Sequence, residues 1–453
     1  MLKQARNVYH YGLVFFMEYI SIEALYARFQ ESGAVCTDTR KIVTGSVFFA
    51  LSGPSFNGNT FARQALEGGC RYAVVDQAEA VEDERFLLVE DSLKALQQLA
   101  LYHRRRCKAT IIGITGSNGK TTTKELLASV LRKKFKTLAT QGNLNNQIGV
   151  PLTLLSMPVD TEMAVIEMGA SKPGDIQELV EIAEPNYGLI TNIGKAHLEG
   201  MGGYDGVVKT KTELYDFIRN QGGKVFVNAN HPVFTERSSG METIVFGDSN
   251  SGFVQGKFVD SNPFVRFCWN RVGEGNLEER PVVNTHIMGY YNYENLLAAA
   301  TVGAWFGVSE ADINEALESY VPENNRSQWI ETGKNLLILD AYNANPTSME
   351  AALKNFKSME RPGKVLILGK MMELGAGWEE EHRRIADQAL ETGAEAVYLV
   401  GELYTEAGVN KATRIFNQVE EAVEFFTKNP LTGKCILVKG SRSNKLELLR
   451  PLM

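Results

Sequence analysis

The sequence predicts an α/β protein built from three domains, and three observations support this prediction. The chain has 453 residues, which is about three times the usual length of one domain. Short apolar segments alternate with amphipathic helical segments along most of its length, as they do in βαβ units. Residues 113–123 form a glycine-rich loop between a predicted strand and a predicted helix, a layout that is typical of nucleotide-binding domains.

Composition excludes several classes of protein. Hydrophobic residues make up 44% of the chain and charged residues 22%, as in globular proteins that bury several cores. The net charge of −7 argues against a nucleic-acid partner. The longest apolar segment, residues 296–308, is too short to span a membrane. The five cysteines are scattered without a C-x-x-C pair, which indicates reduced thiols in the cytoplasm and argues against a zinc site.

The first predicted domain covers residues 17–107. Residues 1–16 are basic and aromatic but lack the long apolar core and cleavage site of a signal peptide, so we expect a flexible extension there. Apolar spacing and turn residues then predict helices and strands in alternation. The predicted helices are residues 18–30, 60–67 and 92–103, and the predicted strands are residues 46–51 and 72–75.

The second predicted domain covers residues 108–320, and its pattern predicts a parallel sheet flanked by helices. Continuous apolar segments predict buried parallel strands at residues 110–114, 163–168, 187–191 and 224–227. Helices are predicted between them at residues 120–134, 174–183 and 204–219. Residues 241–287 favour β-strands and hairpins, and residues 292–306 favour a further helix.

The third predicted domain covers residues 321–453 and has a doubly wound pattern. Its predicted strands are residues 335–339, 364–368, 396–400 and 435–438, and its predicted helices are residues 347–357, 379–391, 418–427 and 444–450. The domain lacks a G-x-G-x-x-G fingerprint, so we do not expect NAD binding.

The loop at residues 113–123 predicts a phosphate-binding site. Its glycines allow several N–H groups to point at one anion, and the following helix adds positive potential. Lys120 would neutralise phosphate charge, and the hydroxyl of Thr121 would reach Mg²⁺. Ile114 stands where the general P-loop motif has its first glycine, so the spacing alone also fits a glycine turn in an ordinary βα unit. The Gly-Lys-Thr sequence at the junction favours phosphate binding.

Three further residues stand where they could carry chemistry, but only Glu167 is a metal-ligand candidate from the sequence pattern itself. Glu167 ends an apolar strand, and a buried carboxylate there needs a partner or a cation. His197 follows the next predicted strand, at the edge where sites form in open α/β sheets. Taken alone, His197 fits a packing or surface residue equally well, and Lys211 fits a solvated lysine on a helix whose other face carries Lys209.

Amide-rich and basic clusters follow several predicted strands. Residues 143–149 (NLNNQIG) and 340–346 (DAYNANP) could hold a peptide or a carboxylate, or could simply form turns. Residues 439–442 (KGSR) could hold an anion or begin a helix.

These segments together resemble the Mur ligase family, and most closely its MurF type. The similar stretches run in family order through nearly the whole chain: GITGSNGKTTT (113–123), GNLNNQIGVP (142–151), IEMGA (166–170), TNIGKAHLEG (191–200), KTEL (211–214), GYYNYEN (289–295), YNANPTSM (342–349), MELG (372–375) and VKGSR (438–442). The last three stretches make the match specific to this type.

The resemblance implies a role for each candidate residue. Catalysis is expected from Lys120, Lys211, His197 and Glu167, with Lys211 carried as a carbamate. Two Mg²⁺ ions are expected at Thr121, Glu167, His197 and the Lys211 carbamate. ATP is expected to contact Gly116, Ser117, Asn118, Gly119, Lys120, Thr121, Thr122, Asn295, Arg326 and Asp340. The other substrates are expected at Thr39, Arg40, Asn145, Asn146, Asn343 and Asn345.

The resemblance also implies an activity. It is the ATP-dependent joining of D-alanyl-D-alanine to UDP-N-acetylmuramoyl-tripeptide through an acyl phosphate, by a monomeric cytoplasmic enzyme of peptidoglycan precursor synthesis. Diaminopimelate and lysine both remain open as the third residue of the tripeptide. Two positions depart from the family pattern, since Leu339 replaces the first of two paired aspartates and Tyr291 replaces a common histidine.

Three alternatives remain at this stage. A folylpolyglutamate synthase would share the phosphate loop, but the segments after residue 342 argue against it. A nucleotide-switch ATPase would hydrolyse ATP without any amine substrate. A binding protein that has lost catalysis is disfavoured because Lys120, Glu167, His197 and Lys211 are all present.

Overall fold

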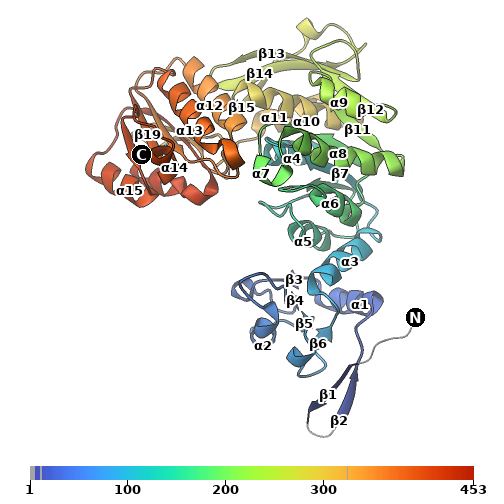
Figure 1. Ribbon diagram of the computed structural model, residues 1–453. Coiled ribbons are helices and arrows are strands. Elements are labelled where there is room, and N and C mark those ends of the chain that lie inside the picture. Colours follow the sequence, from blue (N-terminus) through green and yellow to red (C-terminus); the bar gives the residue numbers. More distant parts are fainter. Residues whose placement is uncertain (1–5, 11–12, 324) are drawn as a thin grey trace. The chain divides into compact units, whose positions relative to one another are not determined.

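The computed structural model has the predicted α/β architecture, with parallel sheets flanked by helices (Figure 1). It describes residues 6–10, 13–323 and 325–453. The chain forms two compact units. The first comprises Met1–Gly113, Lys136–Met168 and Gln177–Asn186, and the second comprises Ile114–Phe135, Gly169–Ile176 and Tyr187–Met453. Each unit is described by itself below, and the domain boundaries near residues 107 and 320 stay a prediction.

The first unit begins with a hairpin that the sequence did not predict. Strands β1 (Arg6–His10) and β2 (Leu13–Met17) pair antiparallel within residues 1–17, where we expected an extension without regular structure. Helix α1 (Ile22–Ser32) begins later than predicted because the hydroxyl of Ser21 accepts a hydrogen bond from the Ala24 N–H and caps the helix.

A small parallel sheet with the order β3-β4-β5-β6 follows. Its strands and helices match the predicted alternation, with β3 and β6 added. The bounds are β3 (Val35–Cys36), β4 (Val47–Phe49), β5 (Tyr72–Val75), β6 (Phe86–Leu88), α2 (Ala62–Glu67) and α3 (Ser92–Arg104). The same unit holds the parallel pair β8 and β9 with two helices: β8 (Thr137–Ala139), β9 (Met163–Glu167), α5 (Gly149–Leu155) and α6 (Asp175–Ala183).

The second unit begins where β7 (Thr110–Thr115) leads into the phosphate loop and helix α4 (Lys120–Leu131). Strands β10, β11, β12 and β13 are parallel neighbours, and β13, β14 and β15 continue as antiparallel ones. The strands and hairpins predicted at residues 241–287 are confirmed, although β12 pairs parallel with its neighbours. The bounds are β10 (Tyr187–Ile190), β11 (Lys224–Asn228), β12 (Glu242–Gly247), β13 (Val254–Ser261), β14 (Phe264–Arg271) and β15 (Val283–Met288).

Helices complete this part of the second unit. They are α7 (Leu198–Met201), α8 (Tyr204–Gln221), α9 (Pro232–Arg237), α10 (Tyr293–Trp305) and α11 (Glu310–Ser319). Helix α10 is buried along most of its length and packs against α4. Its apolar sequence therefore reflects a core helix. Among the described helices, none is long and apolar enough to cross a membrane.

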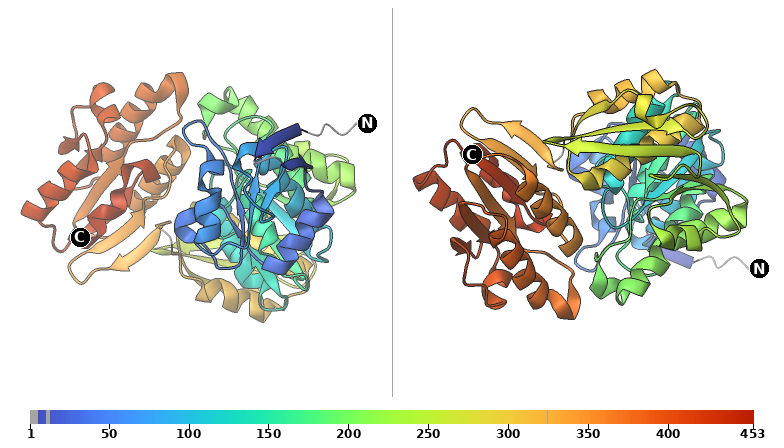
Figure 2. Two further views of the ribbon diagram at one scale, coloured as in Figure 1. Left: turned by 90° about the horizontal axis from the view of Figure 1, so that it is seen from below. Right: turned by 90° about the horizontal axis from the view of Figure 1, so that it is seen from above.

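The C-terminal sheet has the order β16-β17-β21-β18-β19-β20 and is covered on both faces, as Figure 2 shows from two sides. Alternate residues of its strands enter one core with α12 (Pro346–Ser358) and α13 (Trp378–Leu390), and another with α15 (Val419–Lys428). The other bounds are β16 (Gln328–Glu331), β17 (Leu336–Asp340), β18 (Lys364–Gly369), β19 (Ala396–Val400), β20 (Arg414–Phe416), β21 (Cys435–Lys439) and α14 (Glu402–Glu406).

The predicted helix at residues 444–450 is wrong. Two 3₁₀ segments, Arg442–Asn444 and Leu446–Leu452, occupy this region. Lys445 between them has a φ of 51°, in the left-handed region that ends an α-helix, and Pro451 has no N–H for helical pairing.

Candidate active site

The phosphate loop turns sharply between β7 and α4, and two of its glycines are required by that turn. Gly119 has a φ of 78° and caps α4, while Gly116 has a φ of 144°. A Cβ atom on Gly116 would lie 2.0 Å from the Thr191 hydroxyl, and one on Gly119 would lie 2.9 Å from the Asn295 side-chain amide. The loop therefore lies close to both neighbours, which no other residue type would allow.

Side chains after β10 hold the phosphate loop in shape. The Asn118 N–H donates to Asn192 Oδ1 at 3.0 Å, and the Thr191 hydroxyl donates to the Asn118 carbonyl at 2.6 Å. The Gly194 N–H donates to the Ser117 hydroxyl at 2.9 Å. The loop is thereby preorganised, which is what electrostatic stabilisation of phosphate requires.

Lys120 is the first residue of α4 and lies over its own loop. Its ammonium donates to the Gly116 carbonyl at 2.7 Å and to the Ser117 carbonyl at 3.3 Å. Thr121 is buried directly after it, and Thr122 follows on the same helix. The arrangement places a cation and a helix N-terminus at one point, as an anion site requires.

His197 lies beside the cations of this loop. It has a φ of 52°, and its Nδ1 contacts the Glu373 carboxylate. Burial lowers the pKa of His197; the Glu373 carboxylate acts against this, and the positive charges of Lys120 and Lys211 add to it. His197 is partly exposed, with 29% of its side-chain surface accessible, and charged groups from three separate segments act on its imidazole.

Lys211 lies in the middle of α8 with 1% of its surface exposed, whereas Lys209 is exposed. The solvated-lysine reading is wrong for Lys211. Burial and the nearby Lys120 lower its pKa to about 7, and the carboxylates of Asp175 and Glu213 act against this shift. A substantial share of this amine is therefore neutral near pH 7, and a neutral amine is the form that reacts with carbon dioxide.

Asp340, at the end of β17, pairs with Lys439, at the end of the neighbouring strand β21. Lys439 is buried and donates to Asp340 Oδ2 at 2.7 Å and to the Asn343 carbonyl at 3.3 Å. The single lysine ties the predicted nucleotide contact Asp340 to the loop that carries Asn343.

Asn345 connects that loop to the phosphate loop. It is the N-cap of α12, where its Oδ1 accepts from the Ser348 N–H at 2.9 Å. Its side-chain amide donates to Asn118 Oδ1 at 2.8 Å, and the residue is buried. The structure thus brings together two segments that lie 227 positions apart in the sequence.

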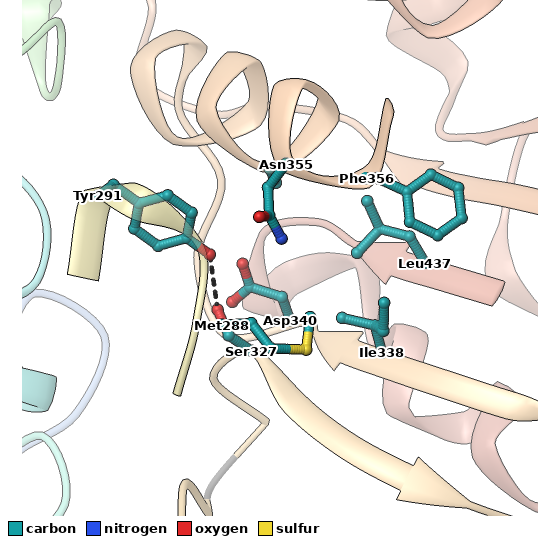
Figure 3. A pocket seen from close by; sticks show the side chains of 9 residues that line it. Met288, Tyr291, Ser327, Ile338, Asp340, Asn355, Phe356 and Leu437 are labelled. Atoms are coloured by element: carbon teal, nitrogen blue, oxygen red, sulfur yellow. Dashed lines mark hydrogen bonds between the residues drawn. The ribbon is translucent and has the colours of Figure 1, made fainter. Parts of the chain in front are cut away.

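A small pocket of about 10 Å³, which has room for about one water molecule, lies beside Asp340 (Figure 3). The Tyr291 hydroxyl and the Ser327 hydroxyl are 3.0 Å apart at its edge, and burial raises the pKa of Tyr291. Asn355 from α12 points toward Asp340, and apolar side chains form the remaining wall: Met288, Ile338, Phe356 and Leu437. Polar side chains therefore meet here beside a small apolar patch.

Arg326 and Asn295 take up different positions near this site. The Arg326 guanidinium stacks over the Tyr342 ring at 3.7 Å from its centroid. Asn295 is buried in α10 against Gly119, and its amide donates to Asn292 Oδ1 at 2.9 Å. Asn295 therefore packs against the phosphate loop at Gly119.

The first unit holds the other candidate residues. Asn145 donates to Glu167 Oε1 at 2.8 Å, and Glu167 has 1% of its surface exposed. Asn146 lies just before α5, and its Oδ1 accepts from the N–H of Gly149, the first residue of that helix, at 2.9 Å. Thr39 and Arg40 lie on a short 3₁₀ turn capped by Asp38. Hydrogen bonds from Arg40 lower the pKa of Asp38 to about 2.

Among the described residues, no three His, Cys, Asp or Glu side chains converge as a ready metal site. The carboxylates nearest to Lys211 in its electrostatic surroundings are those of Asp175 and Glu213.

Sequence reasoning missed several residues that shape the site. Thr191 and Asn192 stand at the end of a predicted strand, where polar residues were the available signal, but they were given no role. Lys439 was named only within a segment that could hold an anion, without Asp340 as its partner. Glu373 lies in the MELG segment, which matched the family without an assigned role.

Known proteins were compared with the chain. Residues 114–303 match the family model described as Mur ligase middle domain, and residues 325–442 match the one described as Mur ligase, glutamate ligase domain. The UDP-N-acetylmuramoyl-tripeptide–D-alanyl-D-alanine ligase of Bacillus subtilis is 34% identical over 91% of each chain. The enzyme of that name from Escherichia coli is 33% identical, over 91% of this chain and 92% of its own.

Solved structures are similar over the same length. A crystal structure of MurF from Acinetobacter baumannii matches with a TM-score of 0.81 and 31% identity, covering 92% of each chain. MurF ligase from Thermotoga maritima in complex with ADP matches with a TM-score of 0.80 and 26% identity, covering 93% of this chain and 97% of the other.

Proposed function

Because the chain belongs to the Mur ligase family, we propose that it joins D-alanyl-D-alanine to UDP-N-acetylmuramoyl-tripeptide with ATP, in peptidoglycan precursor synthesis. The observation that carries this proposal is the hydrogen bond between Asn118 and Asn345. It joins the phosphate loop to the polar loop after β17, so ATP phosphates and an incoming peptide would meet at one place.

The reaction has two steps. The terminal carboxylate of the tripeptide attacks the γ-phosphate of ATP, which gives an acyl phosphate and ADP. The amine of the dipeptide then attacks the acyl carbon, phosphate leaves, and a peptide bond remains after the amine has lost a proton. A carboxylate is a poor electrophile, so the first step supplies the leaving group that the second step needs.

The residues of the phosphate loop bind and orient the nucleotide. Lys120 and the N–H groups from Gly116 to Thr122 neutralise the charge that builds up on the transferred phosphate. Asn295 supports the loop, while Arg326 and Asp340 contact the nucleoside beside the pocket of Figure 3. The support for this assignment is the similarity of these positions to the nucleotide contacts of the family.

Magnesium would be held by Thr121, Glu167, His197 and a carbamate on Lys211. When bound, it supplies positive charge to the phosphate oxygens. We propose two ions, as the family resemblance implies. The support in this chain is the buried Lys211 amine, whose pKa of about 7 leaves it reactive toward carbon dioxide near neutral pH.

The remaining residues bind the other substrates. Thr39 and Arg40 are assigned to the UDP group, Asn145 and Asn146 to the tripeptide, and Asn343 and Asn345 to the dipeptide. We place the reaction in the cytoplasm, where both nucleotide substrates are made. We also propose that the enzyme is a monomer.

The test is ligation measured by mass spectrometry and by phosphate release. Enzyme, ATP, Mg²⁺ and UDP-N-acetylmuramoyl-tripeptide should release phosphate steadily only when D-alanyl-D-alanine is added, and the pentapeptide product should accumulate. Tripeptides with diaminopimelate or lysine are compared in parallel. Ligation of single amino acids but not of the dipeptide would overturn the assignment, and ATP turnover without any acceptor would favour a nucleotide switch.

A further inference from the structure

The loop at residues 371–375 follows β18 in the C-terminal sheet and is fixed at its start. The Met371 N–H donates to His382 Nε2 at 3.1 Å, and the amide of Asn444 donates to the Lys370 carbonyl at 2.9 Å. His382 is fully buried, and its Nδ1 bonds to the Trp378 carbonyl at 2.7 Å. The position of the loop is therefore set by the core of its own sheet.

Glu373 extends from this loop to His197. It has a φ of 62°, and its carboxylate contacts His197 Nδ1. His197 is also in the left-handed region, with a φ of 52°. Non-glycine residues are strained in this region and persist there only where the surroundings hold them. The contact between Glu373 and His197 joins a strand end of the C-terminal sheet to the segment that follows β10.

The contact determines which ring nitrogen of His197 is presented to the reaction site. A carboxylate accepts a hydrogen bond, so Nδ1 carries the proton, and Nε2 is left as the nitrogen with a lone pair. This arrangement of carboxylate and imidazole fixes both the tautomer and the ring orientation of histidines that face a cation.

We propose that Glu373 is a positioning residue for His197. From the C-terminal sheet, Glu373 holds the imidazole so that Nε2 faces the reaction site. The inference rests on the proposed function, since it assigns a task to the residue behind His197. Glu373 itself does not touch the reacting atoms.

Neighbouring contacts do not explain the ring orientation. The Lys195 N–H donates to the Thr347 hydroxyl at 3.1 Å, and the Lys195 ammonium pairs with Glu381 at 3.1 Å. These contacts hold the backbone two residues before His197. They connect this segment to helices α12 and α13 and leave the imidazole to Glu373. The pair of Lys195 with Glu381 is therefore a matched control.

The experiment compares Glu373→Ala, Glu373→Gln and Glu381→Gln in the full-length enzyme. Nitrogen-15 NMR of the histidine rings, assigned with His197→Gln, reports the His197 tautomer in the absence of substrates. We expect a single His197 tautomer, protonated at Nδ1, in the wild-type enzyme and in Glu381→Gln. In Glu373→Ala we expect a mixture of the two tautomers. Since this readout requires no turnover, it stands even where the proposed ligation fails.

Kinetics give the second readout. Glu373→Ala should lower kcat of ligation by about 10-fold to 100-fold, with KM for ATP changed less than twofold. Glu373→Gln keeps an acceptor oxygen, so it should recover most of the lost activity and the single tautomer. Glu381→Gln should stay within twofold of the unmodified enzyme.

Three results would overturn the inference. The first is an unchanged tautomer in Glu373→Ala, whatever its activity. The second is a mixed tautomer with normal kcat. The third is an equal loss of activity in Glu381→Gln, which would show that general contact between the segments matters and not the ring. If Glu373→Ala does not fold, the same criteria apply to Glu373→Met, which keeps the length of the side chain without an acceptor.

Discussion

Lys439 and Asp340 end two neighbouring strands of the C-terminal sheet, with the ammonium nitrogen 2.7 Å from the carboxylate oxygen. The lysine side chain is 3% exposed and the aspartate side chain 16%. Because both groups are largely withdrawn from water, each depends on the other for compensation of its charge.

Lys439→Met should leave Asp340 as an uncompensated carboxylate. We expect a loss of about 3–5 kcal/mol in the free energy of unfolding, together with a raised KM for ATP. Denaturant unfolding and steady-state kinetics measure the two effects. The double variant Lys439→Met/Asp340→Asn should recover much of the stability but not the KM. A single variant as stable as the unmodified protein would contradict the assigned pair.

Lys211→Ala should remove the amine that is proposed to carry the carbamate. We expect ligase activity to fall by about a hundredfold or more and to recover in part with added acetate or formate. Lys209→Ala on the exposed face of the same helix is the control and should retain activity.

The modification can also be observed directly. Enzyme equilibrated with ¹³C-bicarbonate should show a carbamate carbonyl signal that Lys211→Ala lacks. Since the pKa of Lys211 is about 7, the amine is mostly neutral at pH 8 and mostly protonated at pH 6. The signal should therefore weaken as the pH falls across this range, and a pH-independent signal would argue against Lys211 as its source.

Asn345→Asp and Asn345→Ser separate the two hydrogen bonds of Asn345. Both variants keep an oxygen that can cap α12, but aspartate places an oxygen against Asn118 Oδ1, and serine is too short to reach it. We expect nearly unchanged thermal stability in both. Ligation should fall more in the aspartate variant, because its negative charge also faces the phosphate site.

Asn345→Ala loses the cap as well as the bridge to Asn118. Its free energy of unfolding should be lower than that of the serine variant by about 0.5–2 kcal/mol. An aspartate variant with normal kcat would show that the bridge to Asn118 does not matter for the reaction.

His382 should make stability depend on pH. Burial lowers its pKa below the ordinary 6.5, and the nearby Lys370 lowers it further. The unfolded chain therefore binds a proton at a higher pH than the folded one. The contribution is fully present above pH 6.5 and is lost as the pH falls toward the folded pKa. Denaturant unfolding between pH 8 and pH 5 should show this slope, and His382→Gln should reduce it.

Much of the fold follows from local sequence. The strands at residues 72–75 and 396–400 were predicted with the bounds that the structure has, because each is a continuous apolar segment between turn residues. The region at residues 444–450 was not, because its left-handed Lys445 is set by the turn after β21 and has no local signature.

The candidate site divides in the same way. The phosphate loop was predictable because its glycines, lysine and helix are consecutive in sequence. The burial of Lys211 was not, since a lysine on a helix gives no sign of the loops and strands that cover it. The contacts of Asn118 with Asn345 and of His197 with Glu373 join residues 227 and 176 positions apart, so only the folded chain brings them together.

Helix α12 sets the distance between two parts of the candidate site within the second unit. Its N-cap Asn345 bonds to the phosphate loop, and Asn355 lines the pocket beside Asp340. Ten residues of α-helix span about 15 Å, and one inserted residue would turn everything after it by about 100°. The distance between the phosphate loop and the pocket is therefore determined by the number of residues in one helix. Side chains of α12 that do not contact the site should tolerate substitution. Insertions and deletions should be tolerated only outside residues 345–355.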